Sequence, residues 1–142
     1  MASAGLKRVP MSLSVSDRLD ILDLLARADN AASRRDADAY VKLFSDDVVL
    51  DGGQGIHVGK EQLRQAVGPI WASEGDATLH LTLNPTLEVA DSSAGEVIAN
   101  SVLLIVRPGA SPHILTAAMI TQRIRRIGTS WQIAHRTVKT LS

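Results

Sequence analysis

The segment from Thr78 to Pro85 combines a titratable side chain with a clear structural pattern. Its residues alternate, so that polar side chains face one way and leucines the other, which predicts a strand. The leucine face consists of Leu79, Leu81 and Leu83, and the polar face of Thr78, His80, Thr82 and Asn84. An imidazole has an ordinary pKa of ~6.5, so it can accept a proton at neutral pH if a carboxylate orients it. His80 is therefore a candidate general base, and the alternative is a core histidine bonded to a backbone carbonyl or to Ser33.

Asp29 is the carboxylate that we expect to reach His80. It lies on the apolar face of the first predicted helix, where another leucine or alanine would be the usual residue. A buried carboxylate of purely structural use is the alternative interpretation. The adjacent pair Asp46 and Asp47 lies at a helix-to-strand corner, where carboxylates cap and turn the chain, so we expect that pair to be structural.

No metal or phosphate site is predicted. The other histidines, His57, His113 and His135, share no ligand spacing with one another or with the carboxylates. The glycine-rich segment 52–55 does not lead into a helix as a phosphate-binding loop would, so it is read as a turn. We expect no cofactor.

Helices in the first half of the chain, followed by a long antiparallel run of strands, predict the α+β class. The helices are expected at 16–34 with Ser16 as N-cap, from Asp36 through a buried stripe that ends at Phe44, and at 61–72. The strands are expected at 47–51, 56–58, 78–84, 86–90, 96–107, 113–126 and 131–141. The strand 96–107 is apolar on both faces and is expected to be central and covered twice.

The composition is that of an ordinary folded protein of one domain. The 142 residues have a formal net charge of +0 and no cysteine, which argues against nucleic-acid partners and disulfides. No apolar run approaches the ~20 residues of a membrane span, so no membrane association is expected. We expect a flexible tail at 1–15, a domain at 16–142 and a cytoplasmic location.

Several segments together resemble the SnoaL-like family of the nuclear-transport-factor-2-like (NTF2-like) superfamily. They are Ser33 to Tyr40, Leu43 to Val48, Gly59 to Leu63, Leu79 to Pro85 and Trp131 to Arg136, and the resemblance runs over about 16–141. It implies a cone-shaped α+β barrel, a curved mixed or antiparallel sheet around a small-molecule pocket, and homodimers packed through the outer face of the sheet. The leucine face of 78–84 and the doubly apolar strand also need a cover, which agrees with a homodimer.

The resemblance also implies chemistry. Members of the branch that includes scytalone dehydratase and lindane dehydrochlorinase use a histidine–aspartate dyad, and their histidine corresponds to His80. Their aspartate corresponds to Ser33, which cannot carry a negative charge. Asp29 lies one helical turn earlier on nearly the same face, so it is the candidate displaced partner. Ketosteroid isomerase requires a tyrosine where this chain has Ala28, which excludes that activity.

The predicted pocket is mostly aliphatic and suits a small, mostly apolar ligand with one or two polar groups. The candidate ligand-binding residues are Ser33, Trp71, Thr78, Thr82, Thr116, Ile120 and Arg136, with Ala118 beside them. Either Asn100 or Ser101 faces inward. In some relatives the position of Arg136 faces a leaving anion, whereas a solvated arginine is the alternative here.

Two functions fit these residues. The first is a cofactor-independent lyase, dehydratase or isomerase in which His80 is the base. The second is a non-catalytic ligand-binding or dimerisation module of the same fold, which has Ser33 in place of the acid.

Overall fold

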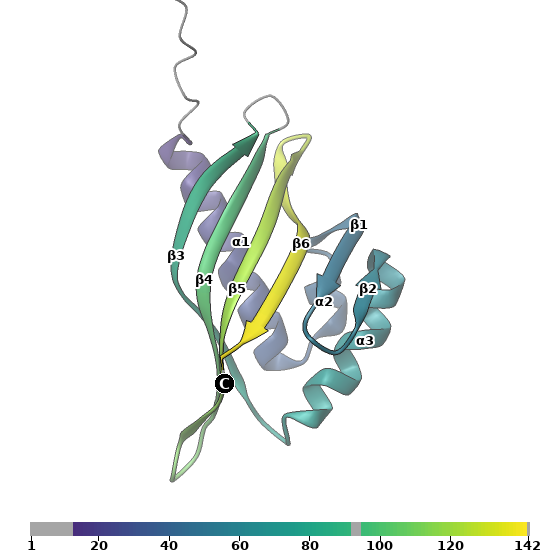
Figure 1. Ribbon diagram of the computed structural model, residues 1–142, viewed down its shortest axis with the longest axis vertical. Coiled ribbons are helices and arrows are strands. Elements are labelled where there is room, and N and C mark those ends of the chain that lie inside the picture. Colours follow the sequence, from purple (N-terminus) through teal and green to yellow (C-terminus); the bar gives the residue numbers. More distant parts are fainter. Residues whose placement is uncertain (1–12, 92–94, 142) are drawn as a thin grey trace, which may run out of the picture.

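The computed structural model describes residues 13–91 and 95–141 (Figure 1). Most of the tail predicted at 1–15 lies outside the described residues. The described elements are α1 (Val15–Arg34), α2 (Ala37–Val41), β1 (Phe44–Asp51), β2 (Ile56–Val58), α3 (Gly59–Ser73), β3 (Leu79–Asp91), β4 (Glu96–Arg107), β5 (His113–Ile127) and β6 (Ser130–Thr140). The strands form one sheet in the order β2-β1-β6-β5-β4-β3, antiparallel except for the β1–β6 pair. The α+β prediction is confirmed.

The long helix α1 covers the inner face of the sheet, and its buried stripe joins the main core. That stripe consists of Ile21, Leu24, Leu25, Ala28, Ala31 and Ala32. Figure 1 shows α1 behind the long strands, and α2 and α3 beside the short strands β1 and β2. Ser14 caps the helix by accepting a hydrogen bond from the Asp17 amide at 3.0 Å, so the prediction of Ser16 as N-cap was wrong. The cap lies three residues before the amide that it satisfies, as N-cap geometry requires.

The edge strand β3 is one element, whereas the sequence predicted two strands separated near Pro85. Its pairing with β4 shifts register between Leu83 and Thr86, and Asn84 has a φ of +54°. A bulge of this kind adds a residue to one strand without ending the pairing. Pro85 is tolerated there because an edge strand does not need every backbone N–H for the ladder.

The free edge of β3 is covered by polar side chains of α1. The backbone N–H of His80 donates to Ser33 Oγ at 2.8 Å, and that of Thr82 donates to Asp29 Oδ2 at 2.7 Å. Thr82 Oγ1 also donates to Asp29 Oδ1 at 2.9 Å. Helix residues four apart are separated by ~6 Å along the axis and strand residues two apart by ~6.6 Å, so the two pairs match in spacing. Asp29 and Ser33 thus satisfy amides that would otherwise remain open for edge pairing.

Burial shows which side chains of β4 face the inside of the sheet. Ser101 is buried on the inner face with Ala99 and Leu103, and Asn100 lies on the outer face. The outer face of β4 is only half-buried, so the prediction that this strand is covered on both faces is wrong for the single chain. The apolar residues of this face belong to a surface on the outside of the sheet.

The outer face of β3, β4 and β5 carries a continuous apolar surface, which we term the outer apolar patch. Strand register aligns its members in three rows: Leu79, Val106 and Ile114; Leu81, Leu104 and Ala117; Leu83, Val102 and Met119. The three leucines of β3 are 38–43% exposed, which confirms that the leucine face points away from the core. In the described part of the chain, no helix has both the length and the apolar character needed to cross a membrane.

Candidate functional site

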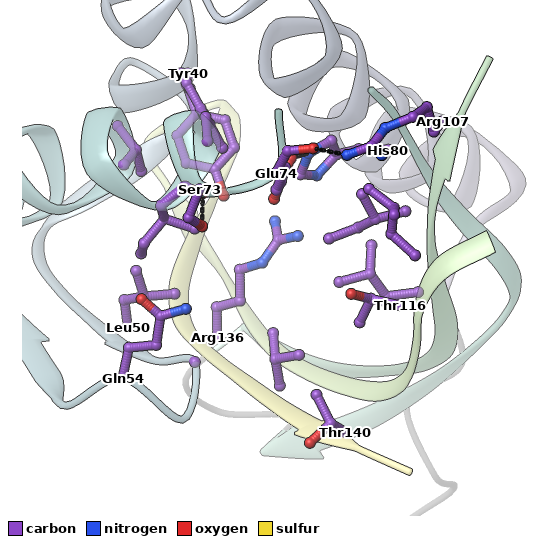
Figure 2. Close-up of a pocket in the computed structure, with 18 residues that line it drawn as sticks. Tyr40, Leu50, Gln54, Ser73, Glu74, His80, Arg107, Thr116, Arg136 and Thr140 are labelled. Carbon is purple, nitrogen blue, oxygen red and sulfur yellow. Dashed lines mark hydrogen bonds and ion pairs between the residues drawn. The ribbon is translucent and has the colours of Figure 1, made fainter. Parts of the chain in front are cut away.

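A cavity of about 390 Å³ opens between the inner face of the sheet and helices α2 and α3 (Figure 2). Its volume lies within the ~300–1,000 Å³ of typical small-molecule sites. The lining residues are Tyr40, Leu50, Gly52, Gln54, Val67, Ile70, Trp71, Ser73, Glu74, His80, Leu103, Ile105, Arg107, Leu115, Thr116, Arg136, Val138 and Thr140. Its aliphatic part comes from β1, α3, β4, β5 and β6, and its polar side chains come from the helices, the β1–β2 loop, the corner after α3 and the strands β3 to β6.

The imidazole of His80 is paired with a carboxylate. Its Nε2 lies within hydrogen-bond distance of Glu74 Oε1, at 2.8 Å, with side-chain exposures of 7% for His80 and 11% for Glu74. Thr78 Oγ1 donates to the same oxygen at 2.8 Å. Both hydrogen bonds reach Oε1, and no hydrogen bond within the described ranges reaches Oε2. Figure 2 shows Glu74 and His80 side by side, with the second oxygen of Glu74 directed toward Arg136.

Glu74, rather than Asp29, is the carboxylate bonded to the His80 ring. The predicted His80–Asp29 pairing is therefore corrected: both oxygens of Asp29 are engaged by Thr82, and Ser33 binds the His80 backbone instead of its ring. Burial raises the pKa of the Asp29 carboxyl, and the positive charge of Arg136 and the Thr82 hydrogen bonds act in the opposite direction. Asp29 and Ser33 thus join α1 to β3 behind the site.

The corner that carries Glu74 is held by two arginines. Glu74 is the C-cap of α3, and Gly75 follows it with a φ of +99° that L side chains rarely adopt. Arg107 Nη2 donates to the Glu74 carbonyl oxygen at 2.9 Å, and Arg35 Nη2 donates to that of Gly75. A Cβ at Gly75 would meet Arg107 Nη2 at 2.7 Å. The sharp turn at glycine lets the carboxylate reach back to His80 from the end of the helix.

Arg136 and Tyr40 form the second polar group of the cavity. Arg136 on β6 is 5% exposed, and its guanidinium carbon lies 5.9 Å from the centroid of the Tyr40 ring. Figure 2 shows this side chain rising from β6 toward Glu74 and Tyr40. Burial raises the pKa of the Tyr40 phenol, with Arg136 acting in the opposite direction, so the phenol stays protonated at neutral pH. The cavity therefore presents a cation and an O–H group near the Glu74–His80 pair.

The predicted ligand-binding residues fall into two groups. Trp71, Thr116 and Arg136 line the cavity together with His80. Thr78 is buried and holds Glu74, while Ser33 and Thr82 belong to the contact between α1 and β3. Ile120 is fully buried in a core cluster with Leu103, Ile105 and Ala118, behind the cavity wall. Within residues 13–91 and 95–141, no group of three or more histidines and carboxylates is arranged to hold a metal ion.

Glu74, Tyr40 and Arg107 are site residues that the sequence interpretation did not identify. Tyr40 was assigned only to the buried stripe of a helix, although its phenol reaches the cavity. For Glu74 the available signal was a glutamate followed by glycine directly after a helix and six residues before His80. Nothing in the alternation of β3 indicates that this corner folds back onto the strand.

Comparison with known proteins gives the same fold. A family model described as a SnoaL-like domain matches residues 13–137. A protein of unknown function with a cystatin-like fold from Nostoc punctiforme is 26% identical, with a TM-score of 0.81 over 92% of this chain and 96% of that one. LinA is 18% identical, with a TM-score of 0.77 over 90% of this chain and 89% of that one.

A putative scytalone dehydratase from Novosphingobium aromaticivorans is 12% identical, with a TM-score of 0.75 over 100% of this chain and 89% of that one. No curated protein matches the chain significantly. The identities to LinA and to the scytalone dehydratase-like protein establish similarity of fold alone.

Proposed function

The chain belongs to the SnoaL-like family, whose fold supports several small-molecule enzymes, and from this premise we propose that it is a cofactor-independent lyase or isomerase. Its substrate would be a small, mostly apolar molecule from which the Glu74–His80 pair removes a proton bound to carbon. The observation that carries the proposal is the 2.8 Å hydrogen bond between His80 Nε2 and Glu74 Oε1 at the wall of the cavity. A buried acid–base pair in a mostly apolar pocket is a typical arrangement for proton transfer.

The roles within the pair follow from which atoms are already bonded. Glu74 Oε1 accepts hydrogen bonds from His80 and Thr78, so Oε2 is the atom that would take the proton. The His80 N–H holds the carboxylate in place and would stay bonded to it when the proton arrives. We therefore propose Glu74 as the base and His80 as the group that orients it, the reverse of the roles expected from the sequence.

The remaining groups would handle the electron pair left on carbon. In a lyase that pair forms a double bond and expels a leaving group from the neighbouring carbon; in an isomerase it is protonated again at another carbon. Either course passes negative charge to an oxygen or a leaving group. Arg136 and the Tyr40 O–H face the same cavity and can stabilise that charge.

Deuterium incorporation from D₂O into simple carbon acids tests the proposal. A panel of small ketones and β-hydroxy carbonyl compounds is incubated with the protein, and exchange of the acidic C–H is followed by NMR. We expect exchange with the wild type and a loss of about 10²–10⁴-fold in Glu74→Gln, the usual contribution of a general base. Glu88→Gln is the matched control, because Glu88 is exposed on β3.

The variant His80→Gln separates the two roles. A glutamine keeps an N–H donor near the position of Nε2, so part of the exchange should survive if Glu74 is the base. Equal loss in His80→Gln and Glu74→Gln would instead make His80 the base. Binding of panel compounds without any exchange would support the non-catalytic ligand-binding module.

A further inference from the structure

Arg136 is a buried cation that has no ion-pair partner at close range among the described residues. Within the described parts of the chain, no carboxylate oxygen lies within 4.0 Å of its guanidinium nitrogens. Two carboxylates belong to its surroundings: both Asp29 oxygens bind Thr82, and Glu74 Oε1 binds His80 and Thr78, while Glu74 Oε2 accepts no hydrogen bond within the described residues. Buried charges are normally paired, because an isolated one loses its hydration without compensation.

The surroundings of Arg136 supply hydrogen-bond donors and neutral groups. Gln122, its cross-strand neighbour on β5, is 1% exposed, and its Oε1 has no hydrogen-bond partner, so Arg136 does not donate to it. Tyr40 lies on the other side with a neutral phenol. Neither neighbour carries negative charge. The lining also includes Arg107, so two guanidinium groups stand against the single carboxylate of Glu74.

From this imbalance we infer that the ligand of the cavity is a small carboxylate with an apolar body. A carboxylate can accept two parallel N–H bonds from a guanidinium, which makes it the natural partner of a buried arginine. The apolar body would lie against Leu103, Ile105, Leu115 and Val138, which form the aliphatic wall between β4, β5 and β6. The inference rests on the proposed function only in naming its substrate class, since binding does not require turnover.

The position of the carboxylate also orders the chemistry. With its anionic end at Arg136, the substrate would present a neighbouring C–H to Glu74, because Figure 2 shows the Arg136 guanidinium pointing toward the Glu74 carboxylate. Arg136 would bind the carboxylate of the substrate before the reaction and that of the product after it. A halide or hydroxide leaving group, in contrast, would bind Arg136 only after its bond to carbon has broken.

Calorimetric titration with matched probes tests the inference. The probes are cyclohexanecarboxylate and hexanoate, and the neutral comparators are cyclohexanecarboxamide and hexanamide, which have nearly the same shape. We expect the carboxylates to bind at least ~30-fold more tightly than the amides, the ratio that loss of a buried charge pair produces. Equal affinity of acid and amide would overturn the inference, and so would chloride competing as well as the carboxylates.

Substitutions locate the binding group. Arg136→Met keeps the length and packing of the side chain and should abolish the preference for carboxylate. Arg136→Lys keeps the positive charge but lacks the planar guanidinium, so it should retain only part of the preference for carboxylate. Arg123→Met is the matched control, because Arg123 is an exposed arginine paired with Glu96 on the surface. A carboxylate preference that survives in Arg136→Met would overturn the assignment, and a thermal melt confirms that each variant is folded.

The variant Glu74→Gln separates this inference from the proposed function. It should lose deuterium exchange but still bind cyclohexanecarboxylate at least as well as the wild type, because a negative charge has left the cavity. Carboxylate binding in the wild type, without exchange of the panel compounds or of oxo acids of the same size, would support the ligand class and refute the enzyme. Exchange of neutral ketones without carboxylate binding would refute the ligand class and leave the enzyme standing.

Discussion

Removal of the Asp29 carboxylate should loosen the edge of β3 without disturbing the Glu74–His80 pair. Asp29→Ala deletes the acceptor of two hydrogen bonds, at 2.7 Å from the Thr82 amide and 2.9 Å from its hydroxyl. A hydrogen bond to a charged group contributes ~1.5–3 kcal/mol. Release of a buried carboxylate from its desolvated site offsets part of that loss, so we expect a net loss of about 2 kcal/mol in the free energy of unfolding. For a domain of this size, that loss corresponds to a fall of roughly 6–8 °C in Tm.

Amide hydrogen exchange measures the effect at the residue itself. A loss of about 2 kcal/mol at the edge corresponds to roughly 30-fold faster exchange of the Thr82 amide. Ser33→Ala should instead accelerate the His80 amide and spare Thr82, because each amide has its own acceptor on α1. Asp23→Ala is the matched control, since Asp23 is an exposed aspartate of the same helix that pairs only with Arg27.

One result would refute this reasoning. If Asp29→Ala left Thr82 exchange and Tm unchanged while it shifted the NMR signals of the His80 ring, Asp29 would be a partner of the imidazole. The covering of the β3 edge would then be a minor contact. The displaced dyad expected from the sequence would have to be restored.

Two further predictions concern assembly and pH. We expect a homodimer that packs through the outer apolar patch. Leu81→Glu places a charge in the middle row of the patch and should give a monomer by light scattering. A wild type that is monomeric at micromolar concentration would contradict this expectation. The second concerns Asp29, whose pKa is raised above 3.8 by burial, so the folded state holds its proton more firmly than the unfolded state does. Its contribution to stability is then greatest below pH ~3.8 and declines as pH rises through the folded-state pKa. The side chain of Asp29→Asn does not titrate, so this variant should gain stability relative to the wild type as the pH rises through that pKa. Urea titrations at a series of pH values measure the difference in unfolding free energy between the two proteins. A difference that does not change with pH would count against burial as the cause of the shift.

The carboxylate of the proposed pair comes from an unexpected part of the chain. The resemblance to SnoaL-like enzymes leads to an acid on α1, where this chain has Ser33. Here the carboxylate belongs to Glu74, at the corner between α3 and β3, and it reaches the same imidazole. The position on α1 satisfies the His80 backbone instead. The imidazole of His80 is thus bonded to a carboxylate that comes from the corner after α3 instead of from α1.

The periodic features of this protein follow from its sequence alone. The alternation around His80 predicted a strand with an apolar and a polar face, the apolar stripe of α1 predicted a packed helix, and the long run of strands after the helices predicted the α+β class. These features repeat along the chain with the geometry of one element, so they can be read without knowing what the element packs against. The placement of Trp71, Thr116 and Arg136 in the cavity followed from the same parity and from the family resemblance.

Which groups meet across elements depends on the tertiary structure. The partner of His80 depends on how Gly75 turns the chain after α3, and on Arg35 and Arg107, which bind the corner from two other elements. The role of Asp29 depends on β3 lying at the edge of the sheet, where its amides need acceptors that a neighbouring strand does not provide. Both outcomes are set by hydrogen bonds between residues far apart in the chain. Local sequence patterns carry no information about such distances.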